Sequence, residues 1–161
     1  MCTFLYYSDP KRHSFSIQIP LEKQPLPGYP EFPITVGEHI RKKRIDLGLL
    51  QREVAEIIGV TESSIWNWEH GTEPELQYNP KIIEFLGYVP FDCPDDAIGR
   101  LAWYRRVNGL TLNELGQQMQ RHPDQLQEWL SGTRIPFRKN QEKIEMFLEN
   151  QKTFLMPEKE T

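Results

Sequence analysis

The sequence predicts an all-α protein built from two copies of one small helical unit, preceded by a Pro-rich arm. Apolar residues recur at helical spacing in short segments that end at glycine. The central sequence repeats itself at a constant shift. Prolines are concentrated before this repeated region, since 6 of the 13 lie in residues 1–33. Together these observations predict two compact helical units of four to five short helices each.

The internal repeat becomes visible when residue 40 is placed on residue 101 and the shift is kept. After one residue is inserted in the second copy, the match continues through a proline and the last helix. The main pairs are Ile40 with Leu101, Arg44 with Arg105, Gly48 with Gly109, Val54 with Leu115, Ala55 with Gly116, Ile65 with Leu126, Trp68 with Trp129, Pro74 with Pro136 and Ile82 with Ile144. The predicted organisation is an arm (1–33), a first unit (34–90), a second, diverged unit (91–152) and a flexible tail (153–161).

The arm is predicted to be irregular, because proline fixes φ and removes a backbone donor. Within it, residues 14–19 alternate polar and apolar side chains, a pattern that favours one short strand.

Each helix of the first unit is predicted from its start and stop signals. The first helix covers Gly37–Leu47 and ends at Gly48, and the second covers Gln51–Ile58 and ends at Gly59. Thr61 is the predicted N-cap of the third, Glu62–His70. The fourth covers Lys81–Leu86. At helical spacing, the predicted core consists of Ile40, Leu47, Val54, Ile58, Val60, Ile65 and Trp68.

Composition excludes several classes of protein. With 38% hydrophobic and 26% charged residues, the chain resembles a soluble globular protein, and it has no apolar run near the ~20 residues that cross a bilayer. Residues 1–7 are apolar but too few for a signal peptide. We therefore expect a cytoplasmic protein with no membrane contact.

The sequence shows no catalytic or metal-binding pattern. Its two cysteines, Cys2 and Cys93, form no CxxC pair, and its four histidines are scattered. No nucleophile–base pair, phosphate-binding glycine loop or paired carboxylate stands out. We expect neither an enzyme nor a cofactor, and no small-molecule ligand is evident.

A tight turn between two helices needs a small residue at the crossing, a residue that tolerates positive φ, and an apolar residue after it. Ala55, Gly59 and Val60 meet these needs. With the residues around them, this spacing resembles the phage repressor and Cro-like helix-turn-helix family, also called the xenobiotic-response-element type. The resemblance covers about residues 36–90 and rests further on Lys43–Leu49, Gln51, Ile65, Trp68, Glu69 and Gly71.

The resemblance implies a repressor-like protein that binds double-stranded DNA and regulates transcription. It makes Glu62–His70 the recognition helix, which lies in the major groove. Helical periodicity leaves Glu62, Ser63, Trp66 and Asn67 on its outer face. Asn67 suits adenine, Ser63 can donate or accept, and Glu62 can accept from cytosine. Trp66 either contacts a thymine methyl or sugar, or packs on a neighbouring loop or a dimer partner.

Other roles also follow from the resemblance. Gln51 matches a position that clamps a phosphate at a helix N-terminus, although it could be an ordinary first-turn residue. Arg44 and Glu69 match a partly buried ion pair that orients the recognition helix. Ala55 and Gly59 are structural. The run Arg41, Lys42 and Lys43 is either a phosphate patch or a solvated helix face.

The second copy differs from the first in its charged positions. After the recognition helix the first copy has Glu73 and Glu75, which would repel phosphate, whereas the second has a basic clamp of Arg134, Arg138 and Lys139. Its apt reading residues are Gln125 and Gln127. Leu112 and Leu130 replace the glutamine and the glutamate, so the second copy either touches DNA or has a structural or dimerising role.

The net charge of −4 weighs against nucleic acid unless basic side chains share one face. Two alternatives to a transcriptional regulator therefore stay open. One is a protein-interaction module on a helix-turn-helix scaffold, and the other is a DNA-binding accessory factor of a mobile element or defence system. A homodimer is also left open.

Overall fold

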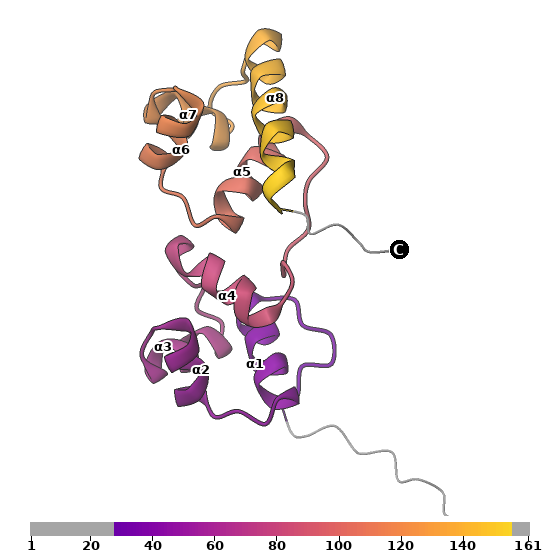
Figure 1. Cartoon of the computed structure of the whole chain (residues 1–161), viewed down its shortest axis with the longest axis vertical. Coiled ribbons are helices and arrows are strands. Elements are labelled where there is room, and N and C mark those ends of the chain that lie inside the picture. The colour runs from indigo at the N-terminus through magenta and orange to yellow at the C-terminus, as the bar shows by residue number, and fades with distance from the viewer. Residues whose placement is uncertain (1–27, 156–161) are drawn as a thin grey trace, which may run out of the picture.

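The computed structural model describes residues 28–155, with side chains through Gln151. The described residues form α-helices and one short 3-10 helix but no strand, which confirms the predicted all-α class. The chain folds into two groups of helices that follow one another along the long axis of the molecule (Figure 1). Helices α1 to α4 form the first unit, and α5 to α8 form the second.

The first unit follows the predicted order with small shifts at the helix ends. Its elements are α1 (Val36–Asp46), α2 (Gln51–Ile58), α3 (Glu62–Glu69), a 3-10 turn (Leu76–Tyr78) and α4 (Asn79–Leu86). Helix α4 begins two residues earlier than predicted, because Pro80 suits a first helical turn, where no backbone donor is needed.

The second unit contains α5 (Ala97–Val107), α6 (Leu112–Met119), α7 (Pro123–Leu130) and α8 (Arg138–Leu155). Helix α8 continues through residue 155, so the tail predicted from residue 153 is helical over its first three residues. The strand predicted at residues 14–19 and most of the predicted arm lie outside the described residues.

A capping box starts helix α1. Thr35 Oγ1 accepts from the Glu38 N–H at 3.2 Å, and Glu38 Oε2 accepts from the backbone N–H groups of Ile34 and Thr35 at 2.7 and 3.0 Å. These backbone donors stabilise the carboxylate and lower the pKa of Glu38. Thr111 and Glu114 repeat the box at α6, where the pKa of Glu114 is lowered for the same reason.

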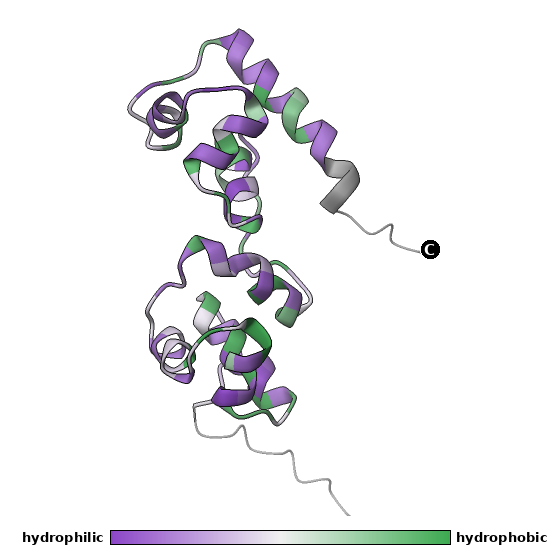
Figure 2. Ribbon diagram, turned by 60° about the vertical axis from the view of Figure 1, so that its left-hand side comes forward, coloured by the Kyte–Doolittle hydropathy of each residue, from purple (hydrophilic) through white to green (hydrophobic). Residues whose placement is uncertain are grey.

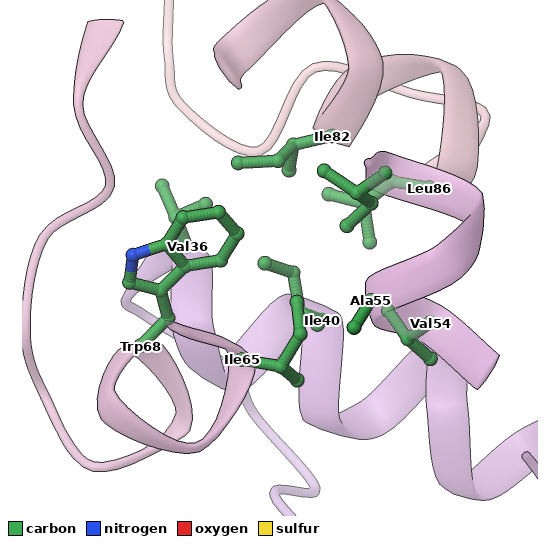
Figure 3. Packing of buried hydrophobic residues seen from close by; sticks show 9 residues of the cluster. Val36, Ile40, Val54, Ala55, Ile65, Trp68, Ile82 and Leu86 are labelled. Carbon is green, nitrogen blue, oxygen red and sulfur yellow. The ribbon is translucent and has the colours of Figure 1, made fainter. Parts of the chain in front are cut away.

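The core of the first unit lies between all four of its helices (Figure 3). Trp68 and Ile65 of α3 face Ile40 of α1 and Ile82 of α4. Leu47, predicted to be in this core, is 55% exposed. It follows the last turn of α1 at the C-cap, where helical periodicity no longer decides the direction of a side chain. The buried set is Val36, Ile40, Val54, Ala55, Ile58, Ile65, Trp68, Ile82 and Leu86.

The second unit has its own core at corresponding positions. Trp129 is 3% exposed, as Trp68 is 6% exposed in the first unit. Hydrophilic and hydrophobic residues are mixed along the helices of both units (Figure 2). The buried set is Leu101, Tyr104, Leu115, Leu126, Trp129, Ile144 and Leu148.

The two units meet where α4 approaches the end of α5. The amide of Asn79, itself only 3% exposed, donates to the backbone carbonyl of Arg106 at 2.9 Å. Phe91, in the segment between α4 and α5, packs against the core of the first unit. The Arg106 guanidinium lies 4.2 Å from its ring centroid, and Trp103 Nε1 donates to its carbonyl at 3.3 Å. Polar and cation–π contacts therefore fix the junction.

Among residues 28–155, no helix combines the length and apolar character needed to cross a membrane.

Candidate nucleic-acid interface

Helix α3 presents the outer face that the sequence predicts. Thr61 caps the helix by accepting from the Ser64 N–H at 3.2 Å. Because Ile65 and Trp68 point into the core, the opposite side is left in solvent. The exposed residues of that side are Glu62, Ser63, Trp66 and Asn67.

The turn between α2 and α3 depends on one left-handed residue. Gly59 caps α2 at φ 81°, and its N–H donates to the Ala55 carbonyl at 2.8 Å. The same carbonyl accepts from the Val60 N–H at 2.9 Å. Ala55 is 3% exposed. In the second unit the equivalent position is Gln120, which adopts φ 54° despite its side chain.

A close approach of helix backbones sets the position of α3 against α1. A Cβ atom on Gly37 would collide with the backbone carbonyl of Trp68. Sequence reasoning missed this role of Gly37, since a glycine at the second position of a helix reads as an ordinary helix start. The sequence feature that could have indicated this role is the position of Gly37, one helical turn before the buried Ile40.

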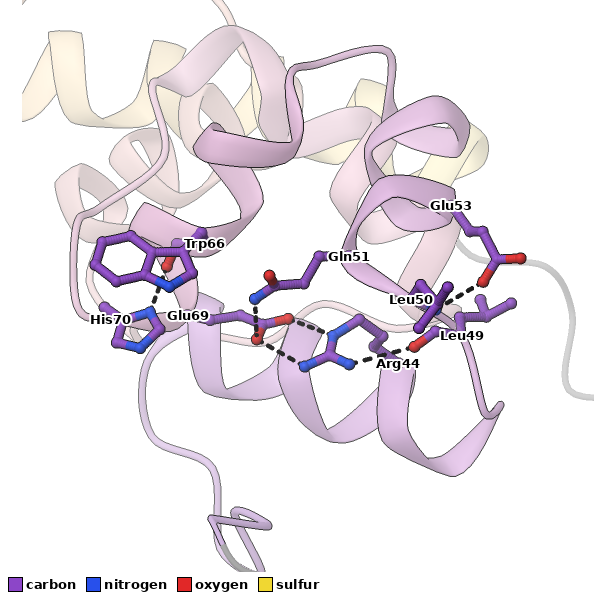
Figure 4. Close-up of polar contacts among 8 residues, drawn as sticks. All are labelled: Arg44, Leu49, Leu50, Gln51, Glu53, Trp66, Glu69 and His70. Atoms are coloured by element: carbon purple, nitrogen blue, oxygen red, sulfur yellow. Dashed lines mark hydrogen bonds and ion pairs between the residues drawn. The ribbon is translucent and has the colours of Figure 1, made fainter.

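A polar network joins the first three helices below the outer face of α3 (Figure 4). Arg44 Nε and Nη2 donate to the two oxygens of Glu69 at 2.6 and 2.8 Å, and Arg44 Nη1 donates to the Leu49 carbonyl at 3.2 Å. Gln51 Nε2 donates to Glu69 Oε2 at 2.9 Å. The Glu69 side chain is 1% exposed. This bidentate pair with a further donor fixes the C-terminal end of α3.

The second unit lacks this network. Arg105, at the position of Arg44, donates through Nε to the Leu110 carbonyl at 3.0 Å, whereas Arg44 donates to the Leu49 carbonyl through Nη1. Leu130 stands where the first unit has Glu69, so the carboxylate is missing. Helix α7 is therefore held by apolar packing on α5 and α6.

Trp66 packs on its own helix. Its ring stacks on His70 with centroids 4.0 Å apart and an interplanar angle of 22°. His70 Nδ1 lies 2.6 Å from the Trp66 carbonyl (Figure 4). The indole remains 51% exposed. The stack fixes the rotamer of Trp66 and leaves half of its surface available to a ligand.

An open cleft of about 510 Å³ runs beside the stack. Its walls bring together the start of α2, the outer face of α3 and the basic side of α1. Three arginines and two carboxylates line it together with the stack, and its polar lining residues include Arg41, Arg44, Gln51, Arg52, Glu62 and Glu69.

The basic run on α1 is only partly free. Lys42 Nζ donates to the Glu31 carbonyl at 2.7 Å and lies 5.5 Å from the Tyr29 ring centroid. Arg41 is half-buried against Gly28, where an added Cβ would collide with its guanidinium. Lys43, also half-buried, makes no ion pair among the described side chains.

The basic clamp predicted in the second unit is partly engaged in ion pairs. Arg134 Nη1 lies 3.3 Å from Glu128 Oε2, and Arg138 Nε lies 3.2 Å from Glu142 Oε1. Lys139 is exposed. On α7, Gln127 is exposed and Gln125 is half-buried, so they differ in access.

The acidic loop of the first unit receives a cation from the second. Arg106 Nη2 pairs with Glu73 Oε1 across the junction. We expected Glu73 to repel phosphate, but part of its charge is neutralised within the molecule. Sequence reasoning could not find this pair, since its partners belong to different units and lie 33 residues apart.

One known family model matches the first unit. Residues 40–92 match the family model described as "Helix-turn-helix", which spans most of α1 through α4. This part of the chain is a helix-turn-helix domain. No solved structure matches the chain.

Proposed function

We propose that this chain, whose residues 40–92 form a helix-turn-helix domain, binds duplex DNA sequence-specifically through α3 and thereby regulates transcription. The observation that carries the proposal is the arrangement of α3. Its polar outer face is exposed, while Glu69 at its end is locked to Arg44 and Gln51. A recognition helix needs both features, because base readout requires accessible side chains on a rigid support.

We assign base reading to the outer face of α3. Asn67 can donate to N7 and accept from N6 of adenine, and Glu62 can accept from N4 of cytosine. The Ser63 hydroxyl lies 2.9 Å from Thr61 Oγ1, which keeps it at the helix start. The free edge of Trp66 suits a thymine methyl or a sugar.

We assign phosphate contacts to the rim of the cleft. Gln51 opens α2, where backbone N–H groups lack helical acceptors and attract anions. Arg41, Lys42 and Lys43 lie on the neighbouring helix. Because the side chain of Gln51 is bonded to Glu69, its backbone N–H is the better phosphate donor.

For the second unit, we propose a second helix-turn-helix domain that adds phosphate contacts through Arg134, Arg138 and Lys139. The first two would exchange a surface carboxylate for phosphate, at little cost because exposed ion pairs contribute only about 0–1 kcal/mol. Gln125 and Gln127 are its proposed base contacts.

The test is a mobility shift with the full chain on genomic fragments, chiefly those near its own gene, at about 50 mM and then 200 mM salt. We expect retention of particular fragments that weakens steeply with salt, because phosphate contacts release counterions. Arg134→Ala should weaken binding to all fragments about equally. If no fragment is retained at the lower salt, the chain is a protein-interaction module.

A further inference from the structure

The loop between α7 and α8 exposes two large apolar side chains, one on each side of a proline. Ile135 is 81% exposed and Phe137 is 74% exposed, whereas Pro136 between them is buried. Burying such a side chain is worth about 1.5–3 kcal/mol, so a partner that covered both would gain from their burial.

The first unit provides an internal comparison for this loop. There, Pro74 is also buried, and the residues on either side of it are the exposed Glu73 and Glu75. The proline framework is thus the same in both units. At the two outward positions, however, the acidic residues of one unit are replaced by isoleucine and phenylalanine in the other.

Hydrogen bonds at both ends hold this loop in place. The N–H of Arg134 donates to the Glu128 carbonyl on α7 at 3.1 Å. The N–H groups of Asn140 and Gln141 donate to the Phe137 carbonyl at 2.7 and 3.1 Å, which starts α8. The two apolar side chains are therefore presented on an ordered backbone.

Basic residues surround the apolar pair. Arg134 precedes it, and Arg138 and Lys139 follow it, all three exposed. Glu128 and Glu142 balance the two arginines, while Lys139 forms no ion pair among the described side chains. An apolar tip between cations fits a partner that is anionic at its edges and apolar within.

We propose that Ile135 and Phe137 form a wedge that enters the minor groove of duplex DNA and unstacks one base step, so that the second unit bends the DNA bound by the first. Apolar side chains between base steps kink DNA by about 20–90°, and phosphates on both sides of the groove would meet the flanking cations. The inference rests on the proposed function. Duplex DNA fits better than a membrane, because two side chains offer little apolar area for a lipid surface.

The experiment measures the bend directly with the full chain and a duplex that it retains in the mobility shift. Dyes on the two ends report their separation by energy transfer. The variant is Ile135→Glu with Phe137→Glu, which restores the pattern of the first unit. Its matched control is Met146→Glu, because Met146 is 62% exposed on α8, outside the loop. Circular dichroism checks that both variants keep their helices.

We expect energy transfer to rise when the unaltered chain or the control binds, and to stay at the level of free DNA when the loop variant binds. Equal bending by the loop variant, or a straight duplex with the unaltered chain, would overturn the wedge and leave the proposed function intact. If the unaltered chain retains no duplex, both fail. Binding to anionic vesicles that the loop variant loses, without bending, would assign the loop to lipid and overturn the wedge.

Discussion

The side-chain amide of Asn79 in α4 donates a 2.9 Å hydrogen bond to the backbone carbonyl of Arg106 near the end of α5. Carbonyls at the end of a helix lack partners inside the helix. Asn79, a residue of the first unit, therefore donates to such a carbonyl in the second unit. Since it is almost fully buried, water cannot replace it easily.

We predict that Asn79→Ala lowers the free energy of unfolding by about 0.5–1.5 kcal/mol, because it removes one hydrogen bond from the Arg106 carbonyl, which keeps the N–H of Gly109 at 3.3 Å. Urea denaturation followed by tryptophan fluorescence measures the change. Gln77→Ala is the control, since within the described part of the chain the amide of Gln77 bonds to the exposed Glu75. Equal effects of the two substitutions would contradict a specific role for Asn79.

Arg44 should contribute far more to stability than an exposed arginine. Arg44→Gln would leave the buried Glu69 carboxylate without its cation, and breaking a buried ion pair costs about 3–5 kcal/mol. The control is Arg138→Gln, whose partner Glu142 lies 3.2 Å away, because both of these side chains are exposed. Exposed pairs contribute about 0–1 kcal/mol. A loss below about 1 kcal/mol for Arg44→Gln in urea denaturation would show that the network does not hold α3.

The turn of the second unit should be improved by glycine. Gln120 occupies the left-handed region at φ 54°, which costs a residue with a side chain roughly 1–2 kcal/mol. Gln120→Gly should therefore raise the midpoint of thermal unfolding. The reverse change in the first unit, Gly59→Ala at φ 81°, should lower it. A lower midpoint for Gln120→Gly would mean that contacts of the glutamine side chain outweigh the backbone strain.

Much of the fold was predictable because its signals are local. The glycine stops, the threonine caps and the helical spacing gave the four helices of the first unit within about two residues at each end. Leu47 was placed in the core wrongly, because periodicity was extended into the C-cap of α1. The exposed face of α3 followed from its buried one.

The remaining features are contacts between distant segments. The close approach of Gly37 to the Trp68 carbonyl depends on how α1 and α3 cross. The ion pair between Arg106 and Glu73 forms only when both units are packed together. The exposure of Ile135 and Phe137 is a property of the folded loop. Such relationships are absent from a linear pattern.

Stability should fall in mild acid through the capping boxes. The folded pKa of Glu38 is below its ordinary value, so its contribution is present above about pH 4.3 and is lost as pH falls through the folded pKa. Glu114 behaves alike. In Glu38→Gln with Glu114→Gln, the free energy of unfolding should fall less steeply between about pH 5 and 3. An unchanged slope would remove the boxes as the cause.

The central claim is that the outer face of α3 reads DNA sequence, and Asn67 tests it most directly. The measurement is selection from a random duplex library with the full chain and with Asn67→Ala, followed by affinities for the selected sequence. We predict a defined motif for the unaltered chain. The variant should lose preference for adenine at one position and bind the motif about 5- to 150-fold more weakly, the equivalent of about 1–3 kcal/mol per bidentate contact. The same motif and affinity for both proteins would contradict the claim.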